Sequence, residues 1–183
     1  MGLVIAIVII VVILLIALGA VTYLRRQRSA QLQGRFGPEY GRTLEGAGSR
    51  REAEAALRER QKRVDNLAIR PLSPEDRQRF STEWEAVQAQ FVDDPPGAVN
   101  QADRLVTEVM QARGYPMGDF EQRAEDISVN HAGVVQNYRA AHDLALRQQE
   151  GEATTEDLRQ AMIHYRSLFA ELLETLQARS STA

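Results

Sequence analysis

The stretch LVIAIVIIVVILLIALGAVTYLRRQR, residues 3–28, divides the chain into two chemically different parts. No charged side chain and no histidine precede position 25, so all 22 basic and all 25 acidic residues follow the apolar run. As a helix, residues 3–24 would extend roughly 33 Å, and the hydrocarbon core of a bilayer is about 30 Å thick. A segment that crosses lipid must pair its backbone polar groups internally, as a helix does. We therefore predict a transmembrane helix over residues 1–24.

A cleaved signal peptide is the main alternative to a retained anchor, because the small residues ALGA at 17–20 offer a cleavage site. Against cleavage, the basic segment that normally precedes such an apolar core is missing, and the run exceeds the usual length of about 7–15 residues. The retained anchor is therefore the preferred prediction, and a secreted helical domain is the alternative. Since the chain has no cysteine, an acylated lipoprotein is excluded.

Arg25, Arg26 and Arg28 follow the apolar run directly and predict its orientation. The positive-inside rule predicts that the N-terminus lies outside the cell and the C-terminal domain in the cytoplasm. The helix would then cross the cell membrane once, and we expect this membrane to be a bacterial inner membrane. Residues 25–70 carry 12 basic and 6 acidic side chains, whereas residues 71–183 carry 10 and 19. The basic part would be attracted to the lipid bilayer with its anionic head groups, and the acidic part is unsuited to nucleic acid.

Two segments are predicted between the anchor and the main domain. Residues 25–48 indicate a basic juxtamembrane linker, because residues 29–48 include five glycines and a proline. Residues 49–70 indicate an exposed amphipathic stalk helix, with Ser49 as its N-cap and Glu52 three positions later. Its apolar face is thin, which predicts self-association or a protein partner through residues 49–69.

Residues 71–178 predict a bundle of about four to six helices, followed by a disordered tail at 179–183. The helix starts are marked by N-cap residues, and a chain break is expected at 128–130. The predicted caps are Ser73, Asp94, Asp119 and Thr154 or Thr155. The predicted apolar faces are Phe80, Trp84, Val87 and Phe91; Ala98, Ala102, Leu105, Val106, Val109 and Met110; Phe120, Ala124 and Ile127; Val134, Val135, Tyr138, Ala141 and Ala145; and Leu158, Met162, Tyr165, Phe169, Leu172 and Leu176. Because no strand-like alternation follows residue 24, the predicted fold class is all-α: a transmembrane helix, a linker and a helical bundle.

The sequence predicts no catalytic residue, no cofactor and no metal site, and therefore no enzyme. A di-iron bundle needs Glu three positions before its histidines, but Ser, Arg and Ala stand there before His131, His142 and His164. His131 and His142 are eleven residues apart, about 16 Å along one helix, which is too far to share an ion. Both are expected to be capping or partly exposed residues.

Five motifs give the chain a likeness to known sequences: RFGPEY at 35–40, FVDDP at 91–95, RGYP at 113–116, DFEQRAEDISVNH at 119–131 and EDLRQAM at 156–162. With them the chain resembles a family of uncharacterised single-pass bacterial membrane proteins that have a C-terminal helical domain. The resemblance implies a membrane location. It implies no activity, ligand or site residue.

The sequence thus favours a membrane-anchored helical protein with an interaction or scaffolding role. Arg25, Arg26 and Arg28 are its predicted membrane-surface residues. The alternative is a membrane-tethered bundle that binds or senses a small molecule beside Trp84, Tyr138 and Tyr165, where aromatic side chains would line a pocket.

Overall fold

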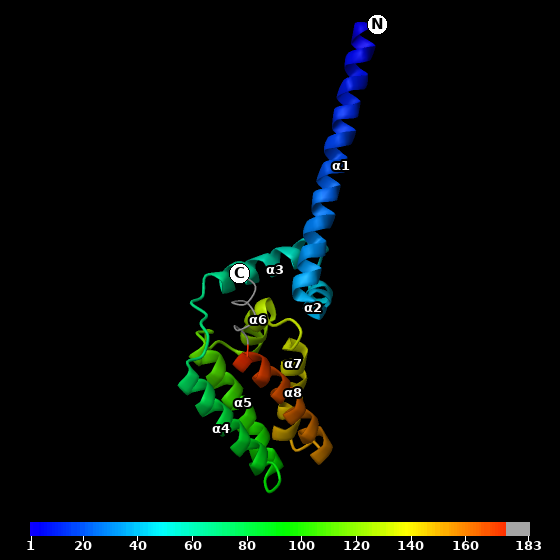
Figure 1. Ribbon diagram of the computed structural model, residues 1–183. Helices are drawn as coiled ribbons and strands as arrows, with labels where there is room; N and C mark the ends of the chain where they lie inside the picture. Colours follow the sequence, from blue (N-terminus) through cyan, green and yellow to red (C-terminus); the bar gives the residue numbers. More distant parts are fainter. Residues whose placement is uncertain (175–183) are drawn as a thin grey trace. The chain divides into compact units, whose positions relative to one another are not determined.

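Every element is a helix in the part of the chain that the computed structural model describes (Figure 1): the backbone of residues 1–174, and their side chains except those of 3–12, 14, 21 and 25. The all-α prediction is therefore confirmed. The chain forms two compact units, Met1–Leu57 and Arg58–Ala183, which are described separately. The helices are α1 (Gly2–Phe36), α2 (Pro38–Gly46), α3 (Arg50–Asp65), α4 (Pro74–Gln90), α5 (Pro95–Ala112), α6 (Phe120–Asn130), α7 (Val135–Gln149) and α8 (Thr155–Glu174).

The predicted transmembrane segment forms the first two thirds of α1, a continuous helix of 35 residues. Half of its side chains, those of residues 3–12, 14 and 21, lie outside the described part of the chain. Among the residues whose side chains are described, no helix meets both the length and the apolarity that a membrane crossing requires.

Residues 25–48 are helical, so the prediction of a linker there is wrong. α1 continues to Phe36, and α2 begins directly after Gly37, whose φ of +49° only glycine adopts easily. Pro38 then occupies the first turn of α2, where its missing N–H costs nothing. Leu32, Phe36 and Tyr40 are buried at intervals of four residues. This apolar spacing outweighs the glycines that suggested a linker.

α3 begins as predicted, since the hydroxyl of Ser49 accepts a hydrogen bond from the backbone N–H of Glu52 at 3.2 Å. Its apolar face is not exposed, however. Ala53, Leu57 and Val64 are all buried within the chain. The prediction of an exposed stalk helix therefore needs correction, because burial in the chain occupies the face that was expected to be free for a partner.

The second unit confirms the predicted helix starts. Each cap side chain accepts a hydrogen bond from the backbone N–H three residues later, which satisfies one of the unpaired donors of a helix N-terminus. The four distances are 3.0 Å for Ser73, 3.0 Å for Asp94, 2.8 Å for Asp119 and 3.2 Å for Thr154.

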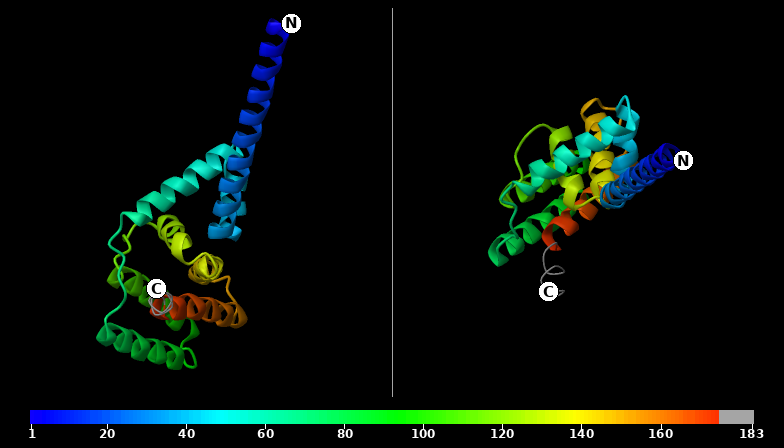
Figure 2. Two further views of the ribbon diagram at one scale, coloured as in Figure 1. Left: turned by 45° about the horizontal axis from the view of Figure 1, so that its top comes forward. Right: turned by 90° about the horizontal axis from the view of Figure 1, so that it is seen from above.

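In this unit α5 packs against both α4 and α8, and α7 packs against α8 and also contacts α5 (Figures 1 and 2). The apolar faces predicted for these helices form one core, in which the ring of Trp84 stacks on Phe169 with centroids 4.7 Å apart. Phe91, Phe120 and Val134 lie at the edge of this core, half-buried. α8 is the longest helix of the unit among residues 58–174, as its regular seam predicts; Leu176 of that seam and the tail at 179–183 lie outside the described residues.

The break between α6 and α7 lies a few residues later than predicted. α6 continues through residues 128–130, and its last turn closes with a hydrogen bond of 2.8 Å from the N–H of His131 to the carbonyl of Ile127. α7 then starts at Val135 instead of His131. The hydroxyl of Ser128 donates to the carbonyl of Glu125 at 2.6 Å, which lets a serine stay inside the helix.

Candidate functional site

The predicted membrane-surface arginines lie in the last third of α1. Arg26 and Arg28 are exposed, and the side chain of Arg25 lies outside the described part of the chain. Successive helical residues are rotated by about 100°, so Arg26 and Arg28 point to nearly opposite sides of the helix. Arg26 and Arg28 therefore form part of a charged ring around the helix and do not line a pocket.

In the first unit a buried carboxylate connects its three helical segments. Oε1 of Glu54 on α3 accepts hydrogen bonds from the hydroxyl of Ser29 on α1, at 2.5 Å, and from that of Tyr40 on α2, at 3.2 Å. Burial raises the pKa of Tyr40, and the hydrogen bond to Glu54 raises it further. The tyrosine therefore stays protonated and serves as a donor, so this cluster fixes α2 and the first turns of α3 to α1.

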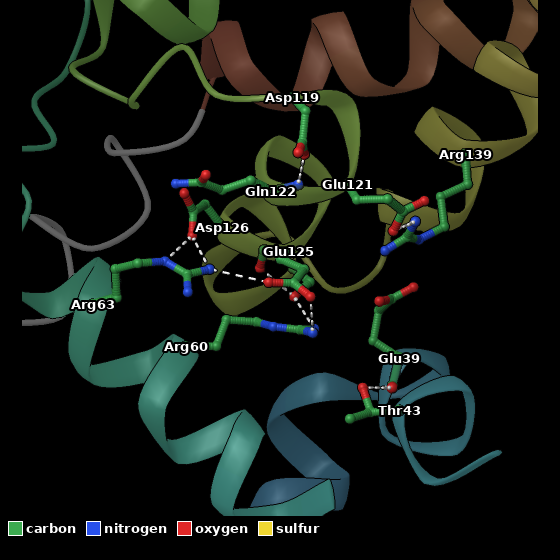
Figure 3. Close-up of polar contacts among 11 residues, drawn as sticks. Glu39, Thr43, Arg60, Arg63, Asp119, Glu121, Gln122, Glu125, Asp126 and Arg139 are labelled. Atoms are coloured by element: carbon green, nitrogen blue, oxygen red, sulfur yellow. Dashed lines mark hydrogen bonds and ion pairs between the residues drawn. The ribbon is translucent and has the colours of Figure 1, made fainter. Parts of the chain in front are cut away.

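In the second unit two arginines on the last turns of α3 contact two adjacent acidic residues on α6 (Figure 3). Nε and Nη2 of Arg63 donate to Oδ1 of Asp126 at 2.8 and 2.7 Å, and Nη2 also reaches Oε2 of Glu125 at 3.2 Å. Arg60 pairs with the other oxygen of Glu125 at 2.8 Å. We call these four residues the α3–α6 ion cluster.

Asp126 is the most unusual member of the α3–α6 ion cluster, because its side chain has no exposed surface. Its Oδ2 atom has no hydrogen-bond partner among the described residues. Burial raises the pKa of this carboxyl, while the guanidinium of Arg63 opposes that shift. A buried carboxylate is costly unless a cation compensates it, so Arg63 is the group that most favours the ionised form of Asp126 in the fold.

A second polar network lies inside the bundle and occupies two of the aromatic residues that were considered for ligand binding. Tyr165 donates to Oδ1 of Asp103 at 2.9 Å, and Nε of Arg123 donates to the hydroxyl oxygen of Tyr138 at 3.1 Å. Both tyrosines are completely buried, and burial raises the pKa of each. Their hydroxyls are used to satisfy the polar groups of neighbouring helices and do not face an open space.

Trp84, the third of those aromatic residues, does line an open hollow, of about 160 Å³, between α4 and α8. Its apolar walls are Trp84 from α4, Phe91 directly after α4, and Met162 and Ile163 from α8. The rim carries Gln88, Arg159 and Arg166. We call this surface the α4–α8 groove. Neither Tyr138 nor Tyr165 is among the residues that line this groove.

The three histidines have different surroundings. Nδ1 of His131 lies 3.1 Å from a carboxylate oxygen of Glu171, the ring of His142 stacks on a phenylalanine of α6, and Nδ1 of His164 lies 3.1 Å from the amide oxygen of Asn137. His131 also ends α6, so it is a capping residue, but it is buried and not partly exposed. Among the described side chains, no group of three potential ligands is close enough to hold a metal ion.

The ion cluster and the groove are the two features that sequence reasoning missed. Arg60 gave a signal, because it interrupts the apolar face of its helix, yet its partner on α6 is 65 positions away in the chain. The geometry provides helix attachment by charge and an open apolar surface with a basic rim. No protein-family model, curated protein or solved structure matches the chain.

Proposed function

We propose that the protein is anchored in a membrane by residues 1–24 and that its second unit is an interaction or scaffolding module on the cytoplasmic side. The observation that carries the anchor is the exposure of large apolar side chains on α1. Ile13, Leu15, Ile16 and Leu18 are each between 58 and 66 % exposed. At about 100° per residue they lie all around the helix, and a helix that is apolar on all sides belongs in lipid or in a core.

The orientation is proposed from charge. Arg26, Arg28 and the preceding Arg25 follow the apolar run directly, and no acidic residue occurs before Glu39. Moving such a basic end across the bilayer is disfavoured, so the helix keeps it in the cytoplasm. Because α1 continues past these arginines to Phe36, the basic ring would stand on a rigid helix at the level of the head groups.

An interaction role is supported by how the second unit uses its polar groups. The carboxylates of the α3–α6 ion cluster are neutralised by arginines, and the buried hydroxyls of Tyr138 and Tyr165 are hydrogen-bonded to side chains of other helices. By contrast, the α4–α8 groove offers apolar and basic groups at the surface. A rigid helical module with such a surface is suited to holding another protein near the membrane.

Fusing a reporter that fluoresces only in the cytoplasm to the C-terminus tests the proposal, with protease treatment of intact cells as a second readout. We expect fluorescence, protection from protease, an uncleaved N-terminus, and a protein that high-salt or alkaline washing does not extract. A dark, protease-accessible domain or a cleaved N-terminus would overturn it.

Replacing Arg25, Arg26 and Arg28 by serine should weaken the orientation and produce a mixed population. Removing three more distant arginines instead, Arg50, Arg51 and Arg58, is the matched control, because charges beyond about 15–20 residues from the span contribute little. If both triple variants behave alike, charge next to the helix does not determine the orientation.

A further inference from the structure

The α4–α8 groove has a shape into which one more helix could pack. α4 and α8 both pack on α5, which leaves a furrow between them, and its lining residues follow a helical repeat on each side. On α8 they are residues 159, 162, 163 and 166; on the other side they are residues 84 and 88 of α4 and its C-cap residue, 91. Each row covers about two helical turns, or roughly 10 Å. A helix with apolar residues at the same spacing would fit along both rows.

We propose that the α4–α8 groove binds an amphipathic helix of a partner protein, with a large apolar side chain of that helix against Trp84 and acidic residues facing Arg159 and Arg166. The hollow of about 160 Å³ has the size for this anchor, because an apolar cavity of about 150 Å³ is known to hold a benzene ring. Met162 and Ile163 form the apolar wall on the α8 side. Buried anchors of this kind dominate the affinity of protein interfaces.

The charges on the rim define the chemistry of the partner. Arg166 is exposed and makes no ion pair with the described residues, and Arg159 pairs only with Glu156, an exposed neighbour on its own helix. Exposed pairs of this type are weak, so Arg159 can turn to another carboxylate at little cost. The two arginines are seven residues apart on one face of α8, the same interval as two carboxylates at i and i+7 of a bound helix. Residues 71–183 carry a net negative charge, so this basic rim is a local exception that favours acidic groups at one place.

The inference rests on the proposed interaction role and can be tested with two synthetic helical peptides that lack tryptophan. Both carry leucine and phenylalanine anchors at i, i+3, i+4 and i+7; one has glutamates beside the anchors and the other has lysines. The full chain is studied in phosphatidylcholine nanodiscs, with empty nanodiscs as the blank. Trp84 is the only tryptophan of the chain, so its emission reports on the groove directly. We expect a saturable change with the acidic peptide and at least tenfold weaker binding of the basic one.

Matched variants locate the binding surface. Ile163 in the groove and Leu146 on α7 are 43 % and 44 % exposed, so Ile163→Glu and Leu146→Glu carry the same surface cost. We expect Ile163→Glu to weaken the acidic peptide at least tenfold and Leu146→Glu to leave it unchanged. Arg166→Glu should transfer the preference to the basic peptide, whereas Arg104→Glu, a charge reversal on α5, should not.

The inference falls if Trp84 does not respond to the acidic peptide, if both peptides bind equally, or if Ile163→Glu behaves like Leu146→Glu. It also falls if sedimentation shows a dimer that Ile163→Glu alone dissociates, because the groove would then hold a second copy of the chain. The C-terminal fluorescent reporter measures the membrane topology of the chain and does not depend on the groove. A failed peptide experiment with a cytoplasmic reporter therefore rejects this inference and leaves the membrane anchor in place.

Discussion

Replacing Arg63 by methionine should destabilise the second unit, because it leaves the carboxylate of Asp126 buried without its cation. Removing one partner of a fully buried ion pair costs about 3–5 kcal/mol. The side chain of Asp126 is completely buried, but that of Arg63 is 36 % exposed, so water screens part of the interaction. We therefore expect a loss of about 2 kcal/mol, which is roughly a thirtyfold change in the folding equilibrium.

Urea denaturation of the full chain in detergent micelles, followed by the emission of Trp84, measures this loss within the second unit. For a urea dependence of about 2 kcal/mol per molar, the midpoint of Arg63→Met should fall by about 1 M at pH 7.5. Arg104→Met is the matched control, since among the described residues Arg104 bonds only to the amide oxygen of Gln101, and its loss should change stability by less than about 0.5 kcal/mol. Equal midpoints for Arg63→Met and the wild type would refute the reasoning.

The dependence on pH separates charge from packing. Burial raises the pKa of Asp126 in the fold above its unfolded value, so the native state holds this proton to higher pH than the unfolded state. In Arg63→Met the pKa of Asp126 in the folded state rises further. At pH values above that pKa the buried carboxylate is ionised, and its cost to stability is then greatest. The deficit of Arg63→Met should therefore shrink as the pH falls through the folded pKa. Adding Asp126→Asn to Arg63→Met should remove this pH dependence. The double variant should lose at least about 1 kcal/mol less unfolding free energy than the sum of the losses in the two single variants.

Three further changes have defined outcomes. Gly114→Ala should cost about 2 kcal/mol in a urea titration, because Gly114 has a φ of +94° and a Cβ there would lie 2.7 Å from a backbone oxygen, whereas Gly133→Ala, at negative φ with open space around it, should be nearly neutral. Tyr165→Phe should cost about 1 kcal/mol by calorimetry, since it removes a 2.9 Å hydrogen bond to a carboxylate on α5. The side-chain bonds from Arg159 and a neighbouring glutamine lower the pKa of Glu156 to about 2, so the support that Glu156 gives α8 is present above its unfolded pKa and is lost as the pH falls through about 2. An NMR titration should find that midpoint, and Arg159→Gln should raise it toward 4.5.

Local chemistry made the helices of the second unit predictable. A cap such as Ser73 and the residues that follow it act within one turn, so the start of α4 can be read without knowledge of the rest of the fold. The apolar seam of α8 is equally local, and its buried residues agree with the prediction. The break after α6 was misplaced by a few residues, because Ser128 can bond to its own helix as well as end it.

Contacts between distant residues could not be predicted in the same way. Arg63 and Asp126 are 63 positions apart, and each alone has the composition of a solvated surface residue. In residues 25–48 two local patterns predict different structures. The glycines indicate a linker, whereas the spacing of Leu32 and Phe36 indicates the buried face of a helix. The burial of these two residues decides in favour of a helix, and a single sequence does not reveal what buries them. The membrane anchor, the orientation and the partner remain predictions that the proposed experiments test.

Arg113, at the end of α5, connects the segment before α4 with α8, two parts of the chain that the ribosome makes at different times. Its Nη1 donates to the carbonyl of Leu172 at 2.8 Å, and the carbonyl of Arg113 itself accepts from the N–H of Arg70. Burial lowers the pKa of Arg113, so the group is sensitive to the loss of an acceptor. On the ribosome, α4 to α7 emerge before residue 172, at about 5–20 residues per second. The nascent bundle therefore keeps an open side, without the Leu172 carbonyl that this arginine contacts, until α8 is made.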